Sequence, residues 1–277
     1  MEWLIGLAAS AGIAGAAYFK RSLSGSGFLA AVAIGSVMYA VGTAVWFGPL
    51  IAFFVSSSLW SKWKQHAKAE AESGYAKSGR RDAGQVFANG GLALILCAAN
   101  QVYPHPLWWY AFLGVMAAVT ADTWATEIGG LSRTPPRSIK TGRRVPPGTS
   151  GGVTGLGFFA SAAGGLFIGG IAWLLLALPG QTAPDDTPAN LRLAAWLGIA
   201  TLSGIIGSLA DSWLGAAWQR MYRCRACGRE IEKNRHCGLP AVPIRGRAGW
   251  TNDTVNAAGS LAGGTSALLL ALALGLG

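Results

Sequence analysis

Long, uniformly apolar runs separated by short polar loops dominate the hydrophobic pattern of this chain. A helix needs about 20 apolar residues to cross a bilayer, with a range of about 17–25. The runs approach or reach this length and are too uniformly apolar to be amphipathic core helices, so they predict transmembrane helices. Eight spans are expected, over residues 3–19, 27–43, 46–60, 84–101, 107–128, 150–178, 192–216 and 250–275.

This pattern predicts an all-α, polytopic integral membrane protein with a single membrane domain over residues 1–277. The stretch over residues 27–60 could form one long broken helix, but its length and its Gly48-Pro49 pair favour a hairpin of two spans. The first apolar run begins with Glu2 and lacks the positive charge that precedes the apolar part of a secretory signal. It is therefore predicted to be a retained first span.

The positions of the charged residues test this topology. Basic residues follow the first, third, fifth and seventh spans, at Lys20, Arg21, Lys62, Lys64, Lys68, Lys77, Arg80, Arg81, Arg133, Arg137, Lys140, Arg143, Arg144 and between Arg220 and Arg247. The loop over residues 102–106 has no Lys or Arg, and the loop over residues 179–190 carries only Asp185 and Asp186 as charged residues. Because Lys and Arg concentrate in cytoplasmic loops, the basic side is predicted to be cytoplasmic and both termini are predicted to lie outside.

Composition agrees with a membrane protein, because 52% of the residues are hydrophobic and only 12% are charged, against about 25% charged in soluble domains. The net charge of +10 is interpreted as topology and contact with anionic membrane lipids, not as nucleic-acid binding. The 40 glycines indicate close helix packing. The small, Gly-rich helix faces around Asp211 and Asn256 leave open whether they bind a ligand or form a homodimer.

Seven polar side chains lie inside the apolar spans, towards their predicted cytoplasmic ends. They are three carboxylates and four amides, namely Asp122, Glu127, Asp211, Gln85, Asn89, Asn252 and Asn256. A charged group in the bilayer costs at least about 2.5–3.5 kcal/mol, so the carboxylates are expected to converge. Convergent carboxylates predict a Mg²⁺ site, since Mg²⁺ is usually held by one or two carboxylates and substrate phosphates. Hydrogen bonding between helices is the structural alternative.

The loop after the fifth span carries basic residues and then a Gly/Ser/Thr run that opens the next span. A helix N-terminus offers free backbone N–H groups to an anion, and glycine lets a phosphate approach the backbone closely. The run lacks the Lys-Ser/Thr pair of a Walker motif, so a flexible turn before a capped helix is the alternative interpretation. The candidate phosphate-binding residues are Lys140, Arg144, Gly148, Thr149, Ser150, Gly151 and Gly152.

A cysteine and histidine cluster lies in the loop over residues 217–249, which is predicted to be cytoplasmic. Cys224 and Cys227 form a C-x-x-C pair, and the adjacent His236 and Cys237 follow in place of a second such pair. Four ligands of this kind predict a closed, tetrahedral structural Zn²⁺ site. A disulfide is the alternative, and a reducing compartment disfavours it.

Five motifs resemble those of the transmembrane protein 19-like family, in order and spacing, across nearly the whole chain. They are Arg81-Asp-Ala-Gly-Gln85-Val-Phe-Ala-Asn89, Ala121-Asp-Thr-Trp-Ala-Thr-Glu-Ile-Gly129, Val145-Pro-Pro-Gly-Thr-Ser-Gly-Gly152, Gly207-Ser-Leu-Ala-Asp-Ser-Trp-Leu-Gly215 and Asn252-Asp-Thr-Val-Asn256. That family includes the plant phytyl-phosphate kinase. It is distantly similar to phytol and dolichol kinases and to CDP-diacylglycerol synthases, which are membrane enzymes that use nucleoside triphosphates, often CTP.

The resemblance implies a prenyl-phosphate kinase that converts phytyl or geranylgeranyl phosphate into the diphosphate, using Mg²⁺ and CTP or another nucleoside triphosphate. On this hypothesis the three carboxylates bind Mg²⁺ and the basic Gly/Ser/Thr loop binds the nucleotide. The residues expected to bind the lipid phosphate or to orient the ligands are Arg81, Gln85, Asn89, Asn252 and Asn256.

Two other functions remain open at this point, a lipid nucleotidyl- or phosphotransferase and a membrane transporter. Paired Asp-containing helices with Gly-rich breaks also suit a transport pathway. An outward-facing cavity that reaches Asp122 and Asp211 would favour transport. A closed outer side with a lateral opening to lipid would favour an enzyme.

Overall fold

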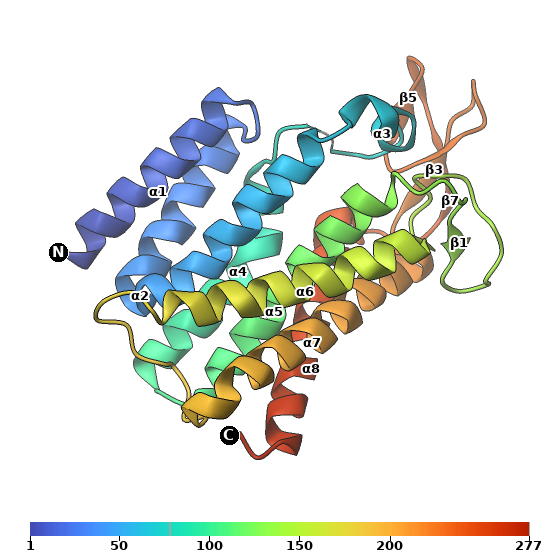
Figure 1. Cartoon of the computed structure of the whole chain (residues 1–277). Coiled ribbons are helices and arrows are strands. Elements are labelled where there is room, and N and C mark those ends of the chain that lie inside the picture. Colours follow the sequence, from blue (N-terminus) through green and yellow to red (C-terminus); the bar gives the residue numbers. More distant parts are fainter. Residues whose placement is uncertain (78, 277) are drawn as a thin grey trace.

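The computed structural model describes residues 1–77 and 79–276 of the chain. Its helices are α1 (Glu2–Phe19), α2 (Gly25–Lys62), α3 (Gln65–Glu72), α4 (Ala83–Val102), α5 (Pro106–Gly129), α6 (Gly155–Leu175), α7 (Ala189–Trp218) and α8 (Asn252–Ala273). Figure 1 shows the seven long helices as one bundle. Helices α2, α4, α6, α7 and α8 pack around α5, in which every residue from Trp109 to Ala121 is buried, and α1 packs on α2.

Six of the described helices are long and apolar enough to cross a membrane, namely α1, α2, α4, α6, α7 and α8. The 24 residues of α5 include Trp, Tyr and acidic side chains that make it less apolar. α2 folds back at Thr43, where φ is 64° and ψ is −171°. Its two arms lie side by side, because a Cβ on Gly35 would be 3.2 Å from the ring of Phe47.

The eight predicted spans therefore correspond to α1, the two arms of α2, α4, α5, α6, α7 and α8. The hairpin predicted over residues 27–60, with spans at 27–43 and 46–60, is confirmed, because the break lies at Thr43; Gly48 and Pro49, which had favoured a hairpin, lie inside the second arm. The predicted start of the sixth span was wrong, because α6 begins at Gly155 and not at residue 150.

Side-chain caps fix the starts of alternate helices at one end of the bundle. Ser24, Asp82, Thr154 and Thr251 each accept a hydrogen bond from the backbone N–H three residues later. Such caps satisfy backbone donors that a helix leaves unpaired in its first turn. Helices α2, α4, α6 and α8 all begin at this end, as alternate elements of an antiparallel bundle do.

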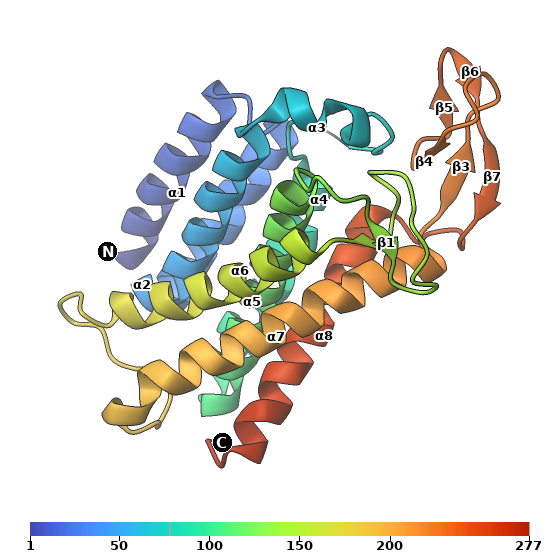
Figure 2. The same ribbon diagram turned by 45° about the vertical axis from the view of Figure 1, so that its right-hand side comes forward.

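Seven short strands, which the sequence did not predict, lie in the loops at this end. β1 (Arg137–Ser138) pairs with β2 (Gly152–Val153), and β3 (Met221–Arg223) lies between β4 (Glu230–Ile231) and β7 (Val242–Arg245). β5 (Arg235–His236) pairs with β6 (Leu239–Pro240). Figures 1 and 2 show these strands and α3 at the end of the bundle opposite both chain termini. That both termini lie at one end agrees with an even number of spans; which end faces the cytoplasm stays a prediction.

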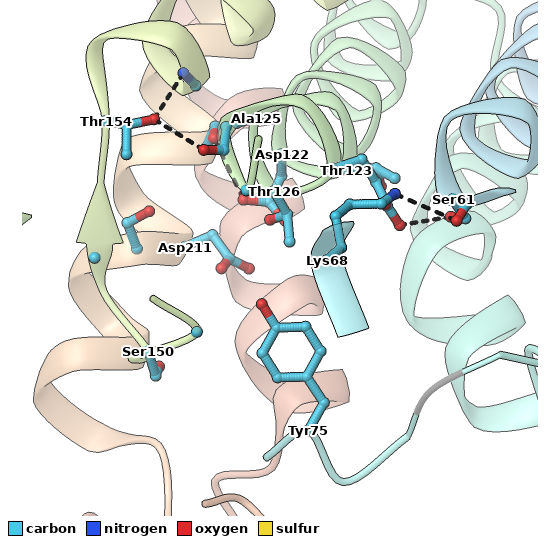
Figure 3. A pocket seen from close by; sticks show the side chains of 18 of the residues that line it. Ser61, Lys68, Tyr75, Asp122, Thr123, Ala125, Thr126, Ser150, Thr154 and Asp211 are labelled. Atoms are coloured by element: carbon cyan, nitrogen blue, oxygen red, sulfur yellow. Dashed lines mark hydrogen bonds and ion pairs between the residues drawn. The ribbon is translucent and has the colours of Figure 1, made fainter. Parts of the chain in front are cut away.

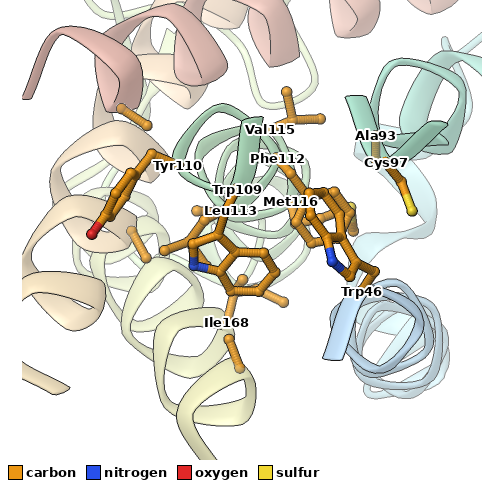
Figure 4. Close-up of a cluster of buried hydrophobic side chains, with 14 of the residues drawn as sticks. Trp46, Ala93, Cys97, Trp109, Tyr110, Phe112, Leu113, Val115, Met116 and Ile168 are labelled. Carbon is orange, nitrogen blue, oxygen red and sulfur yellow. The ribbon is translucent and has the colours of Figure 1, made fainter. Parts of the chain in front are cut away.

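Aromatic side chains fill the half of the bundle near the termini (Figure 4). The ring centre of Trp109 lies 5.2 Å from that of Trp46 and 4.8 Å from that of Trp196. The loop before α7 closes the same end, since buried Asp185 accepts hydrogen bonds from Tyr110 Oη over 2.6 Å and Trp196 Nε1 over 2.9 Å. This dense packing leaves the open volume of the molecule at the opposite end.

Candidate functional site

A polar cavity of about 1270 Å³ occupies the end of the bundle that carries the strands. Residues from helices α2 to α8 and from the loops between them line it. It brings together most of the predicted site residues, which are Arg81, Gln85, Asn89, Asp122, Glu127, Gly148, Thr149, Ser150, Gly151, Gly152, Asp211, Asn252 and Asn256. The polar groups of distant spans thus lie at one end of the bundle, around one cavity, and their part in a binding site stays a prediction.

Asp122 of α5 and Asp211 of α7 are neighbours in the wall of the cavity, as Figure 3 shows. Both carboxylates are half-buried. Asp122 Oδ1 accepts a hydrogen bond from Ser208 Oγ over 3.3 Å. With its amide nitrogen turned towards Asp211, Asn256 donates to Asp211 Oδ2 over 3.0 Å. Two carboxylates with neighbouring hydroxyl and amide oxygens form the kind of oxygen-rich ligand set that Mg²⁺ takes together with substrate phosphates.

Glycines bring the helices that carry these aspartates into close contact. A Cβ on Gly207 would lie 2.3 Å from Cβ of Ala118, and a Cβ on Gly259 would lie 2.9 Å from Cβ of Asp211. Because a side chain at either position would overlap its neighbour, α5, α7 and α8 need glycine there to approach. The Gly-rich faces, for which ligand binding and a homodimer were both open, thus serve packing within one chain.

Glu127 does not join the two aspartates in one ligand set. Its carboxylate accepts a hydrogen bond from Ser61 Oγ over 2.5 Å and forms an ion pair with Lys68, whose side chain is 3% exposed. Within the described residues, the ligand atoms of three or more His, Cys, Asp or Glu side chains come together only at the cysteine and histidine cluster. The prediction of a three-carboxylate metal site is corrected here to a pair, Asp122 and Asp211.

The Gly/Ser/Thr loop lines the cavity. The sequence predicted that this loop forms the N-terminus of the sixth span, but in the structure it ends before α6 begins. Ser150 Oγ donates to Gln219 Oε1 over 2.7 Å at the end of α7. Gly151 has a φ of 81°, and a Cβ there would be 2.3 Å from Cβ of Ala216. The chain then passes through β2 before Thr154 caps α6. The first turn of α6 also lines the cavity, at Thr154, Gly155 and Gly157, so the Gly/Ser/Thr turn and the helix N-terminus are both in reach of an anion there.

Lys140 and Arg144 were predicted to hold phosphates, but both are exposed and are not among the described residues that line the cavity. Other basic residues line the cavity, namely Lys20, Arg21, Lys62, Lys68, Lys77, Arg81, Arg133 and Arg137. Against these eight cations the lining has four carboxylates, an excess of four positive charges. One sign of this excess is visible in the sequence, because all eight residues follow predicted spans on the same side.

Arg81 lies where the cavity meets an apolar groove between α1, α2 and α4. Its Nη1 donates to Ser58 Oγ over 3.0 Å, and its guanidinium carbon lies 5.9 Å from the ring centre of Phe53. The groove has a volume of about 50 Å³ and shares Arg81, Gln85 and Asn89 with the cavity. Burial lowers the pKa of the Arg81 guanidinium below its usual value, and the negative charge of Glu127 opposes that change.

Gln85 and Asn89 make local helix contacts in addition to lining the cavity. Gln85 Oε1 accepts a hydrogen bond from the backbone N–H of Asp82 over 3.2 Å, which completes a capping box. Asn89 Nδ2 donates to the backbone oxygen of Gln85 over 3.0 Å. These contacts give both residues a structural task at the start of α4, beside any contact with a ligand.

Loop residues complete the outer wall of the cavity, which we define by Tyr75, Lys77, Ser150 and Glu232. Burial lowers the pKa of Lys77, but its hydrogen bonds and ion pairs with Asp253 and Asp82 outweigh this and raise it. Burial raises the pKa of Glu232 above that of an exposed glutamate.

The predicted zinc ligands also come together. The ligand atoms of Cys224, Cys227, His236 and Cys237 all lie within 4.8 Å of one another, outside the cavity lining of the described chain. Convergence is what a metal site requires, and the sequence spacing alone had left it open.

Comparison with known proteins gives the following matches. The chain matches the family described as "Integral membrane protein DUF92" over residues 8–264. It is 29% identical over 236 residues to Protein PGR of Arabidopsis thaliana, a match that covers 80% of each chain. It is 31% identical over 164 residues to an uncharacterized membrane protein of Methanocaldococcus jannaschii, which covers 59% of each chain. No solved structure matches the chain. The family match and the plant relative agree with the family resemblance of the sequence motifs.

Proposed function

The chain belongs to the DUF92 family of integral membrane proteins, and from this premise and its cavity we propose that it is a membrane prenyl-phosphate kinase. The enzyme takes a lipid monophosphate from the bilayer and a nucleoside triphosphate, such as CTP, from water. The observation that carries the proposal is the pairing of Asp122 and Asp211 in one cationic cavity. Two carboxylates within an excess of positive charge suit a Mg²⁺ ion shared with several phosphates.

The proposed reaction transfers the γ-phosphoryl group of the nucleotide to the lipid phosphate. An oxygen of the lipid phosphate attacks the γ-phosphorus, the bond from that phosphorus to the β–γ bridging oxygen breaks, and the nucleoside diphosphate leaves. Asp122 and Asp211 would hold the Mg²⁺ ion, which would supply positive charge to neutralise the phosphates. No protein base is required, because a phosphate monoester is largely ionised near neutral pH. The task of the protein is therefore positioning and charge compensation.

The place of Arg81, between the cationic cavity and an apolar groove, supports a substrate whose phosphate is attached to an apolar group. Arg81 is at the junction of the cationic cavity and the groove, whose other walls are mainly apolar. A guanidinium binds phosphate with two parallel hydrogen bonds. We expect Arg81→Gln to raise the KM for the lipid phosphate by about tenfold and to change the KM for the nucleotide little.

The closed end of the bundle favours an enzyme over a transporter. The aromatic cluster of Trp46, Trp109 and Trp196 and the Asp185 network fill the end that a transport pathway would have to cross. We place the cavity end in the cytoplasm, since basic residues collect there. Labelling of the variant Lys140→Cys with a membrane-impermeant thiol reagent only after the inner face is exposed would support this orientation.

The test is to incubate the purified chain in detergent with Mg²⁺, labelled CTP or ATP, and phytyl or geranylgeranyl phosphate. The expected product is the prenyl diphosphate together with the nucleoside diphosphate. Asp211→Asn should lower the rate by at least about 100-fold, because it removes a charge that balances the metal. Asp186→Asn is the matched control, since Asp186 is exposed on the loop at the far end.

The products also separate the proposal from its rivals. Absence of a diphosphate with every common nucleoside triphosphate would refute the kinase. A lipid-linked nucleotide and pyrophosphate would instead assign the cavity to nucleotidyl transfer, in which the α-phosphorus is attacked. Prenyl phosphate moved across vesicles without nucleotide would indicate transport.

A further inference from the structure

The strands between α7 and α8 form a small unit around the cysteine and histidine cluster (Figure 2). Two tight turns present the ligands. Gly228 has a φ of 70° and its N–H donates to the backbone oxygen of Cys224 over 3.0 Å, while Cys237 and Gly238 have φ values of 51° and 77°. Left-handed backbone at successive positions of a turn is strained for a cysteine. The two turns together bring the ligand atoms of Cys224, Cys227, His236 and Cys237 within 4.8 Å of one another.

The distances in the cluster match those around a tetrahedral Zn²⁺ ion. His236 Nδ1 lies 3.5 Å from Cys227 Sγ and 3.2 Å from Cys237 Sγ. Zn–S bonds of about 2.3 Å and Zn–N bonds of about 2.0–2.1 Å place sulfur and nitrogen ligands about 3.5 Å apart. Cys224 Sγ completes the set of four, within 4.8 Å of the other ligand atoms.

The unit has too little apolar core to hold itself together. Met221, Cys224 and Ile231 are its only buried residues within the described chain. Small domains that cannot bury a core depend on metals or disulfides, and all three cysteines of the cluster are free thiols. A bound Zn²⁺ would provide the missing stabilisation.

One side of the unit is bonded to the segment that carries Tyr75 and Lys77. The backbone N–H of Glu232 donates to the oxygen of Gly74 over 2.9 Å, and the N–H of Ala76 donates to Glu232 Oε2 over 3.0 Å. Tyr75, between these two contacts, points into the cavity towards Asp211 in Figure 3. The position of Tyr75 in the outer wall thus depends on Glu232.

The other side of the unit is bonded to α7 and to the Gly/Ser/Thr loop. Arg245 Nη1 donates to the backbone oxygen of Ala216 over 3.0 Å, and Arg245 Nη2 donates to that of Ser150 over 3.4 Å. A cation at these last carbonyls stabilises the C-terminal end of the helix. The small unit of strands β3 to β7, which we call the β3–β7 unit, therefore contacts both edges of the outer wall.

We propose that Cys224, Cys227, His236 and Cys237 bind one structural Zn²⁺ ion, and that the ion holds the β3–β7 unit as a brace between the Tyr75 segment and the Ser150 loop. The ion is outside the cavity and takes no part in phosphoryl transfer. The brace fixes the outer wall whatever reaction the cavity performs, so its test does not depend on the proposed kinase activity.

The first measurement is the metal content of the full-length chain purified in detergent without chelators. One equivalent of zinc per chain is expected, and exchange with Co²⁺ should give thiolate charge-transfer and tetrahedral ligand-field absorption. Cys227→Ser should lower the zinc content to near zero. Cys97→Ser, which changes a cysteine buried in the bundle, should leave it at one equivalent.

The second measurement is hydrogen exchange across the brace. Zinc removal from the wild-type chain by a chelator should speed exchange at the Ala76 and Glu232 amides by about tenfold, and added Zn²⁺ should restore protection. Peptides from α6 provide the internal control. A zinc-free wild-type chain or a disulfide among the cluster cysteines would overturn the site, and bound zinc without an effect on exchange would overturn the brace.

Discussion

The buried ion pair between Lys68 and Glu127, in the lining of the cavity, gives the sharpest test of what stabilises this part of the fold. The Lys68 side chain is 3% exposed, and its Nζ also donates to the backbone oxygens of Trp60 over 2.8 Å and Ser61 over 3.2 Å. It joins α3, the end of α2 and α5 across 59 residues of sequence. Lys68→Met should therefore destabilise the fold and not only change the charge of the cavity.

The expected magnitude follows from the burial of the pair. Removal of one partner of a buried ion pair costs about 3–5 kcal/mol, because the other charge stays buried without compensation. The Glu127 side chain is 17% exposed at the cavity, so the lower end, about 3 kcal/mol, applies. At about 2–4 °C per kcal/mol for a chain of this size, the Tm should fall by about 6–12 °C.

A double-mutant cycle isolates the pair. Glu127→Gln removes the uncompensated charge, so the double variant Lys68→Met/Glu127→Gln should regain about 2 kcal/mol relative to Lys68→Met alone. The Tm is measured in detergent from the fluorescence of the 12 tryptophans. Lys140→Met, at an exposed lysine outside the cavity lining, is the matched control. A double variant as unstable as Lys68→Met would refute the reasoning.

Two further predictions concern the loops around the cavity. Gly151→Ala should lower stability by about 3 kcal/mol, because the new Cβ combines a left-handed φ of 81° with an approach of 2.3 Å to Ala216 Cβ. The control Gly155→Ala, with no atom within 4 Å of the new Cβ, should leave the Tm almost unchanged, and equal losses in both variants would contradict the argument. Burial would raise the pKa of Asp82, but hydrogen bonds from the Gln85 backbone and from Lys77 outweigh it and lower the pKa below 3.8. The stabilisation by Asp82 is then present above its unfolded pKa of about 3.9 and is lost as pH falls below that value through the lower pKa of the folded state. Asp82→Asn should flatten the Tm curve over that range, and parallel curves for the two proteins would contradict the assignment.

The sequence by itself determined the helical membrane architecture. A bilayer demands about 20 apolar residues per helix and strongly disfavours charge, and both requirements are local and visible in a linear pattern. The same requirement identified Asp122 and Asp211, since carboxylates in apolar spans must meet polar partners. Lys and Arg in alternate loops predicted that the polar groups would share one end, and the cavity lining agrees.

The tertiary structure alone decided which of these groups act together. Glu127 looks like a third metal ligand in the sequence, but α3 brings Lys68 to it from 59 residues away. Lys140 and Arg144 follow the right span, yet the β1–β2 pairing leaves them exposed outside the lining of the described cavity.

The Gly-rich faces were equally ambiguous, because the choice between ligand, partner and neighbouring helix depends on how α5, α7 and α8 cross. The physical reason is common to all three cases. Insertion into a membrane is decided within one segment, whereas a binding site is decided by contacts between segments that the linear pattern does not specify.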